Sequence, residues 1–210
     1  MNGPVWLGAG FGVIVLLAGA AALARLVFAW RVHRPTDGEV DIHNVLMGVS
    51  MAGVLIPQLL IATGGAATTA WLVLWIIVTL WFAVSVSRDA AHGASGRRFA
   101  GHHVPHLVMS AAMVYMFSVG NGPIPGADAG PASLATLAYA FVVFMAGYAV
   151  IVVDRLPVIA VAGSGDARVI GRAPADASAT RNAPVAPRLA AATNVVMAVV
   201  MGYMLVLLFG

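Results

Sequence analysis

Residues His102 to Phe117 read HHVPHLVMSAAMVYMF, a stretch in which three histidines lead into an uncharged apolar segment. Within that segment Met109, Met113 and Met116 recur at helical spacing. Proline is well suited to a first helical turn, so the pattern predicts a helix that begins at Pro105 and ends near Val119. The helix is short for a bilayer, which takes about 20 apolar residues, and we expect its flanks or a locally thinner membrane to make up the difference.

The composition of the whole chain points to the same environment. Of its 210 residues 61% are hydrophobic and only 9% are charged, whereas soluble domains carry roughly a quarter charged residues. The chain has no cysteine, which excludes disulfides, thiolate ligands and thiol catalysis. A soluble globular fold is therefore excluded in favour of a membrane protein.

Apolar runs long enough to cross a bilayer recur along the chain and predict one integral-membrane domain over residues 1–210. Lipid-exposed backbone must satisfy its own hydrogen bonds, so the runs are expected to be helices, and no alternating strands of a barrel are present. The predicted fold is an all-α polytopic bundle of six transmembrane helices, at residues 5–24, 42–63, 68–86, 105–119, 133–153 and 188–209. Asp41 is the expected N-cap of the second span.

The arginines predict how the bundle is oriented. All eleven basic residues are arginines, and all fall after the first, third and fifth predicted spans or at the first residue of the sixth. The positive-inside rule makes that side cytoplasmic, so both termini face outward across the cytoplasmic membrane. Residues 158–187, rich in Ala, Gly, Pro and Ser, are expected to form a flexible cytoplasmic loop. Because the arginines follow topology, the basic charge does not indicate a nucleic-acid partner; Arg25 is expected to extend to the interface.

The even-numbered spans share a pattern of methionines headed by a polar residue. On the second span His43, Met47 and Met51 are four residues apart, and the fourth and sixth spans repeat a second spacing. Each of those two sets falls within an arc of about 80° on its helix. The two sets are His106, Met109, Met113 and Met116, and Asn194, Met197, Met201 and Met204.

Soft-metal ligation is the chemistry that would use these stripes. Thioethers favour Cu(I), imidazole accepts copper in either oxidation state, and a thioether needs no deprotonation inside a bilayer. His43 and His106 are the leading candidate ligands, while His102, His103 and Asp41 would widen the entrance. The full candidate set for copper is His43, Met47, Met51, His106, Met109, Met113, Met116, Met197 and Met201. The expected partners are the lipid bilayer and a copper ion or a metal-delivering protein.

Two other hypotheses account for the same residues. Methionine is a flexible gap-filler, so the stripes are equally those of a structural or accessory membrane subunit without a metal site. His43 and His106, at similar depth, would also serve as the two axial ligands of a single b-type haem. Asn194, about a turn and a half into the sixth span, is a residue type that often joins helices by a hydrogen bond. No nucleophile elbow, paired carboxylates or phosphate loop supports an enzyme.

The segments DIHNVLMGVSMAGVLIP (41–57) and HLVMSAAMVYMF (106–117) resemble an actinobacterial family of multi-pass membrane proteins, domain of unknown function 5134. In that family a histidine followed by spaced methionines opens one span and recurs in a later one. Here the matching positions are His43, Met47 and Met51, and then His106 with the three methionines that follow it. The resemblance implies an inner-membrane protein and no particular reaction.

Overall fold

A computed structural model describes residues 5–33, 38–59, 61–62, 64–91, 103–120, 131–163 and 187–209. These residues form helices and the turns beside them, and no strand occurs among them. The helices are α1 (Val5–Arg31), α2 (Gly38–Leu55), the single 3-10 turn η1 (Pro57–Leu59), α3 (Gly65–Ala91), α5 (Val104–Gly120), α6 (Pro131–Gly163) and α8 (Pro187–Phe209). The all-helical class predicted from the composition is confirmed.

The second predicted span is wrong at its far end. It was expected to run to residue 63, but α2 stops at Leu55. The proline at position 57 disfavours helical geometry in the residue before it, and the chain turns through η1 instead. Gly64 then takes a left-handed backbone, with φ of 91°, at the start of α3. The indole of Trp71 donates to the carbonyl of Ile61 at 2.9 Å, which ties α3 to this turn.

Helix α6 is longer than the predicted span 133–153. It continues to Gly163, so residues 158–163 belong to a helix and not to the expected flexible loop. Pro157 lies inside it, where a proline removes one backbone hydrogen bond without having to end the helix, and the apolar residues 158–162 carry the helix on. The rest of the predicted loop, residues 164–186, lies outside the described part of the chain.

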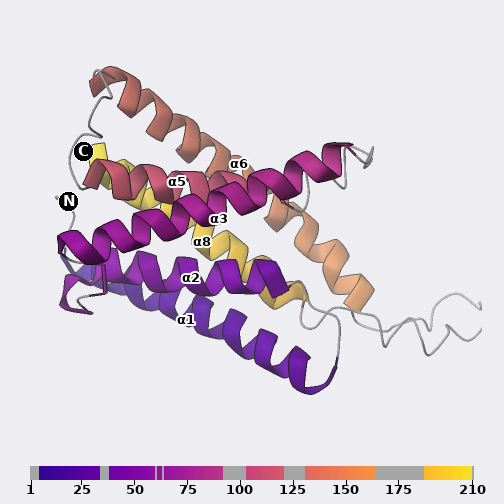
Figure 1. Ribbon diagram of the computed structural model, residues 1–210. Coiled ribbons are helices and arrows are strands. Elements are labelled where there is room, and N and C mark those ends of the chain that lie inside the picture. The colour runs from indigo at the N-terminus through magenta and orange to yellow at the C-terminus, as the bar shows by residue number, and fades with distance from the viewer. Residues whose placement is uncertain are drawn as a thin grey trace, which may run out of the picture.

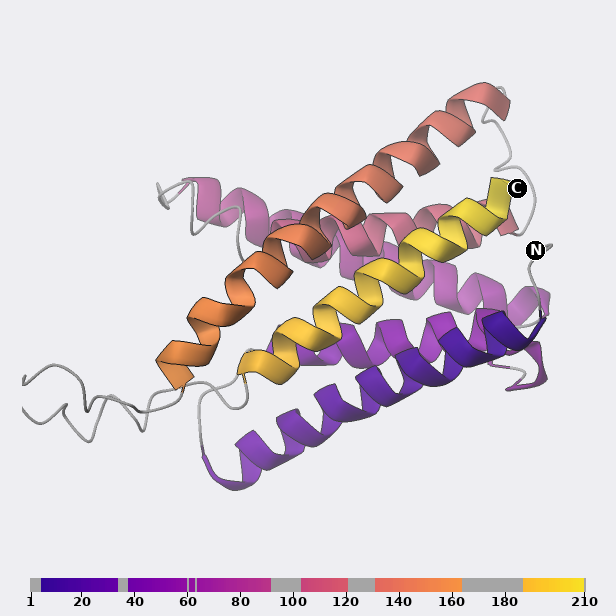
Figure 2. The same cartoon turned by 180° about the vertical axis from the view of Figure 1, so that it is seen from behind.

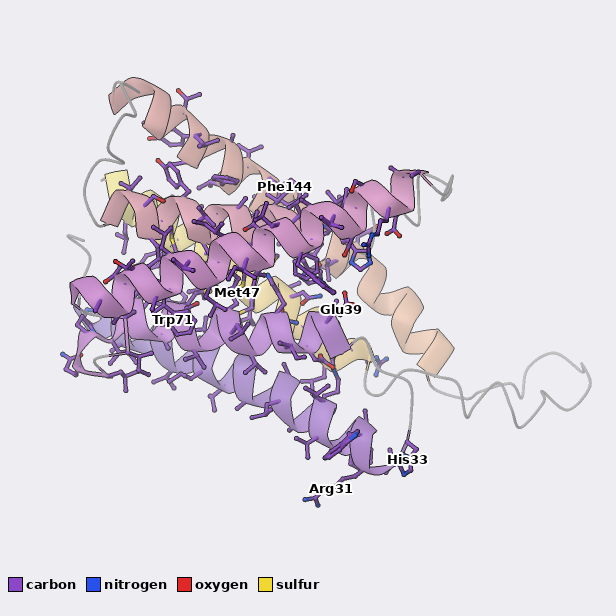
Figure 3. All side chains as sticks on the ribbon, viewed as in Figure 1. Arg31, His33, Glu39, Met47, Trp71 and Phe144 are labelled. Carbon is purple, nitrogen blue, oxygen red and sulfur yellow. The ribbon has the colours of Figure 1, made fainter. Side chains whose placement is uncertain are left out.

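The helices pack as three neighbouring pairs whose directions alternate along the chain (Figures 1 and 2). The pairs are α1 with α2, α3 with α5, and α6 with α8, and α8 also contacts α1, α2 and α5. Both ends of the chain lie at one end of the bundle. Arg31 and His33, at the end of α1, lie at the opposite end (Figure 3).

Within the described part of the chain, four helices are long and apolar enough to cross a membrane, at Trp6–Arg31, Gly65–Ala91, Ala135–Asp154 and Arg188–Leu207. Large apolar side chains on their outer faces are exposed, among them Ile77 and Leu80 of α3, as expected of surfaces that face lipid. Helix α5 is apolar but shorter, and α2 carries Glu39, Asp41 and two further polar residues in its first turns. The architecture is that of a helical membrane protein.

The backbones of α1 and α2 approach each other closely at Gly48. A methyl group built on Gly48 would lie 2.7 Å from the carbonyl oxygen of Val15 and 3.1 Å from the Cα atom of Gly19. Both neighbours are backbone atoms and cannot rotate away. Small residues of this kind let helix backbones approach in membrane proteins, where packing takes the place of a hydrophobic driving force.

We therefore expect Gly48→Ala to force α1 and α2 apart and to lower the free energy of unfolding by about 1–3 kcal/mol. The measurement is the midpoint of thermal unfolding in detergent. Gly10→Ala is the matched control, because a methyl group there has no neighbour within 4 Å. Equal midpoints for the two variants would show that this approach does not limit packing.

Candidate functional site

Helix α2 carries the candidate site because it is buried on two faces. His43, Met47 and Met51 lie four residues apart and form one buried row, while Asp41 and Asn44 belong to a second buried row. A helix with so many buried polar groups must satisfy them within the protein. The first row faces the histidine and methionines of other helices, and the second joins α2 to α1 and α8.

Asp41 forms a buried ion pair with Arg25 of α1. The guanidinium Nη2 contacts Oδ1 of the carboxylate, and its Nε donates to Oδ2 at 3.3 Å. Three expectations are corrected here. Asp41 is not the N-cap, since α2 begins at Gly38; it is not open at an entrance; and Arg25 does not extend to the interface. An isolated buried charge is so costly that these two residues pair, although 16 positions separate them.

Asn44 links α2 to α8. Its side-chain nitrogen donates to the side-chain oxygen of Asn194 at 3.0 Å. The sequence suggested that Asn194 would join helices in this way, and the hydrogen bond confirms it. In apolar surroundings such a bond fixes both the rotation and the depth of one helix against another.

The two histidines predicted as leading ligands meet in the interior. His43 of α2 and His106 of α5 have ring centroids 4.9 Å apart with the ring planes inclined by 72°. Their exposed fractions are 2% and 3%. Neither ring nitrogen of His43 makes a hydrogen bond of normal geometry. The side chain of the adjacent Asn44 interacts with the imidazole but does not form such a bond. A buried imidazole in this state is free to act as a ligand.

Two aromatic side chains of α3 complete the surroundings of this pair. The ring centroid of His43 lies 5.6 Å from that of Trp75 and 5.2 Å from that of Phe82, both edge to face. Phe82 also stacks on His106 at 5.6 Å. Trp75 is fully buried, and its indole N–H has no acceptor. We call His43, Trp75, Phe82 and His106 the aromatic box.

Of the two histidines expected at the entrance, the structure describes one, His103. The Nε2 atom of His103 lies 3.7 Å from an oxygen of Asp89 at the end of α3, and the His103 ring is tilted against Phe82 at 6.1 Å. His103 is partly exposed and so borders the aromatic box on its outer side. His102 lies outside the described residues.

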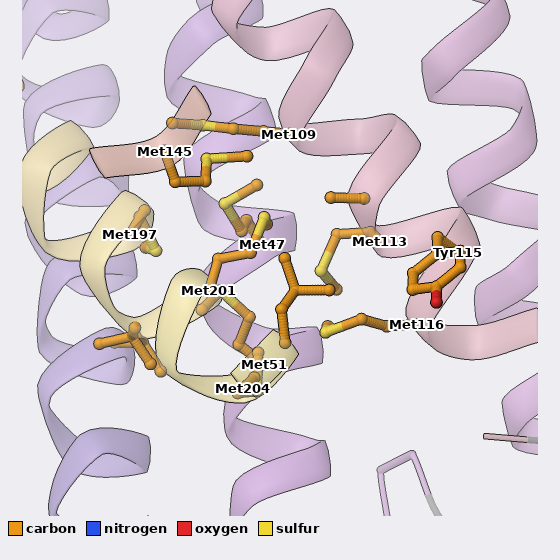
Figure 4. Packing of buried hydrophobic residues seen from close by; sticks show 14 of the residues in the cluster. Met47, Met51, Met109, Met113, Tyr115, Met116, Met145, Met197, Met201 and Met204 are labelled. Carbon is orange, nitrogen blue, oxygen red and sulfur yellow. The ribbon is translucent and has the colours of Figure 1, made fainter. Parts of the chain in front are cut away.

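The three methionine stripes share one core, which Figure 4 shows from close by. Nine of the ten methionines are buried there. They come from four helices: Met47 and Met51 from α2, Met109, Met113 and Met116 from α5, Met145 from α6, and Met197, Met201 and Met204 from α8. Thus all seven methionines of the candidate set lie in a single cluster.

Some members of the site escaped the sequence analysis. Met145 is the one methionine on α6, so no stripe marked it. Trp75 was not singled out, although its place two turns before Phe82 on an apolar helix is a weak signal of shared burial. The ion pair of Asp41 gave no local signal, because its partner is on another helix.

The donor set defines the chemistry open to this site. Among the described residues, no three histidine, aspartate or glutamate side chains come together as a metal-binding group. The donors that do converge are two imidazoles, with thioethers in the neighbouring core. Such neutral, soft donors suit a soft metal ion and do not suit Mg²⁺ or Ca²⁺, which prefer oxygen ligands.

Fold and site together define a helical membrane protein whose interior is built from histidine and methionine. The model of the family described as domain of unknown function (DUF5134) matches residues 36–208. The chain belongs to this family. Comparisons with curated proteins and with solved structures found no match.

The buried ion pair leads to a test with single and double variants. Arg25→Met and Asp41→Leu should each lower the free energy of unfolding by about 3–5 kcal/mol, because each removes one charge from a buried ion pair. The double variant should recover most of that loss, since two apolar side chains then meet. Thermal unfolding in detergent measures all three. A double variant as unstable as the sum of the single ones would contradict the pairing.

Proposed function

We propose that this protein is a six-span protein of the cytoplasmic membrane that binds Cu(I) between His43 and His106 and transfers it along the buried methionines. The observation that carries the proposal is the contact of the two imidazoles, at 4.9 Å between centroids, from helices far apart in the chain. Neither imidazole needs a charged partner to act as a ligand.

The geometry of the pair supports one shared ion. Bonds between such metals and imidazole nitrogen are about 2 Å long, so rings this close can meet one ion in a bent arrangement. That leaves coordination positions for a third, thioether ligand. Met47 follows His43 by one turn of α2, a rise of about 6 Å, and Met109 follows His106 by about 4.5 Å. These two methionines are the nearest in sequence to the imidazoles.

The methionine cluster supports onward transfer. From His106 to Met116 the rise along α5 is about 15 Å, half the thickness of the hydrocarbon core. Thioethers recur at every turn over that length, and those of α2 and α8 lie in the same core. A soft ion exchanging between neutral sulfur ligands meets no fixed charge on this route.

The two alternative hypotheses differ in their support. Tight packing of nine methionines is also what a structural or accessory subunit would have, and the burial alone fits both readings. The haem hypothesis has less support, because the axial ligands of one iron lie on opposite faces of a porphyrin. The imidazoles of His43 and His106 are in edge-to-face contact, so a porphyrin does not fit between them.

A Cu(I) titration distinguishes copper binding from packing. In competition with a chromophoric chelator, the detergent-purified protein should bind Cu(I), and a His43→Ala/His106→Ala double variant should bind it at least tenfold more weakly, about 1.4 kcal/mol. His33→Ala, at the exposed end of α1, is the matched control and should bind like the wild type. Met109→Leu, which nearly keeps the volume, should weaken binding without changing the unfolding temperature.

No binding by the wild type, or equal binding by the wild type and the double histidine variant, would overturn the copper proposal. In the first case the methionines are a packing core. An intense visible absorption band in the purified protein would instead support haem.

The proposed topology has both termini outside the cell and the arginine-bearing end in the cytoplasm. It is supported by the antiparallel helix directions and by the placement of both chain ends opposite Arg31. Alkaline phosphatase fused after Gly210 should be active, because that enzyme folds only outside the cytoplasm, whereas fusion at Asp176 should be inactive. The reverse pattern would invert the topology, and two active fusions would contradict six spans.

A further inference from the structure

The walls of the aromatic box differ from those of an ordinary metal site. His43 is in ring contact with Trp75 and Phe82, and Phe82 also stacks on His106. Trp75 has no exposed surface. Its indole N–H and both nitrogens of His43 lack a well-formed hydrogen bond. An unsatisfied polar atom in a buried place is costly. The unprotonated nitrogen of a neutral imidazole carries a lone pair that a cation can accept, so the nitrogens of His43 point to a missing ligand.

The nearby acidic groups are engaged elsewhere. Asp41 is paired with Arg25 across α1 and α2. The carboxylate of Asp89 is 3.7 Å from His103, and that of Glu39 accepts from the indole of Trp81 at 3.4 Å. The groups left to contact an ion inside the box are imidazoles and aromatic faces, and the nearest thioethers in sequence follow the two histidines by about one helical turn. None of them supplies a negative charge.

The charge of the ion then decides whether it can enter. The cost of removing an ion from water grows with the square of its charge, so a divalent ion among neutral donors is far less favourable than a monovalent one. An aromatic face offsets part of the free energy of removing the ion from water, because its negative π surface attracts a cation most strongly where water is excluded. Tryptophan has the strongest such face among the aromatic residues.

We infer that the aromatic box selects a soft monovalent cation, Cu(I) or its redox-inert analogue Ag(I), over divalent ions, and that Trp75 holds the ion against the two imidazoles with its π face. The inference rests on the proposed function for the site itself, and adds the selection by charge and the role of Trp75. In this role Trp75 stabilises the charge of the ion, as a carboxylate or thiolate ligand does in sites for divalent metals.

The first experiment needs no substitution. The detergent-purified wild type is titrated with Ag(I) and, separately, with Zn(II), while tryptophan emission is recorded. Ag(I) should quench the emission and saturate, and Zn(II) should bind at least 100-fold more weakly. Zn(II) binding as tight as that of Ag(I) would overturn the selection by charge, even if the histidine variant confirmed the site.

The second experiment isolates Trp75. Trp75→Phe should remove most of the Ag(I)-dependent quenching, while Trp30→Phe, a control at an exposed position on α1, should leave it unchanged. Trp75→Leu, which removes the π face, should weaken Ag(I) binding roughly tenfold. Phe82→Leu gives a second test on the same wall should the Trp75 variants fold poorly, and thermal unfolding is recorded for each variant.

The outcomes separate the two proposals. Unchanged quenching in Trp75→Phe, together with unchanged affinity in Trp75→Leu and loss of binding in the double histidine variant, would overturn the role of Trp75 and leave the histidine site standing. No binding of Ag(I) or Cu(I) by the wild type would overturn both. Loss of quenching and of affinity in the Trp75 variants, with the Trp30→Phe control intact, would establish the π contact.

Discussion

The ion pair of Arg25 and Asp41 is the constraint on which the arrangement of the bundle depends. A carboxylate with no exposed surface has to meet a cation, and that cation is on the preceding helix. The pair therefore fixes the depth of α2 against α1, while Gly48 allows the backbones to approach closely about two turns further along α2. Once α2 is held there, Asn44 reaches Asn194 of α8, and three helices share one register.

That register has a consequence for the neighbouring row of buried side chains on α2. Because Asp41 and Asn44 point towards α1 and α8, the row of His43, Met47 and Met51 points towards the core shared with α5 and α8. The row of Asp41 and Asn44 thus makes strong, directional polar contacts, whereas the row of His43, Met47 and Met51 makes contacts that depend less on direction. Methionine suits the second role, since its unbranched side chain fills irregular space among several helices.

Much of this arrangement was predictable from sequence, and the failures have a physical pattern. The helical class and the approximate spans follow from the composition and from the lengths of the apolar runs, and each methionine stripe follows from the periodicity of its own helix. That the stripes meet in one core does not follow from any of these. The expected end of α2 was wrong because hydrophobicity was given more weight than the backbone restriction imposed by Pro57. The partner of Asp41 and the aromatic wall from Trp75 depend on which helices become neighbours, and no single helix records that.

The family match begins at residue 36, after the whole of α1. Yet α1 supplies Arg25 for Asp41 and the backbone against which Gly48 closes. The boundary of the family's sequence pattern is consequently not a boundary of the folding unit. A chain trimmed to the matched residues would keep His43, His106 and every clustered methionine. It would lack Arg25, the cation that pairs with the buried carboxylate of Asp41, and one face of α2 would be open to lipid.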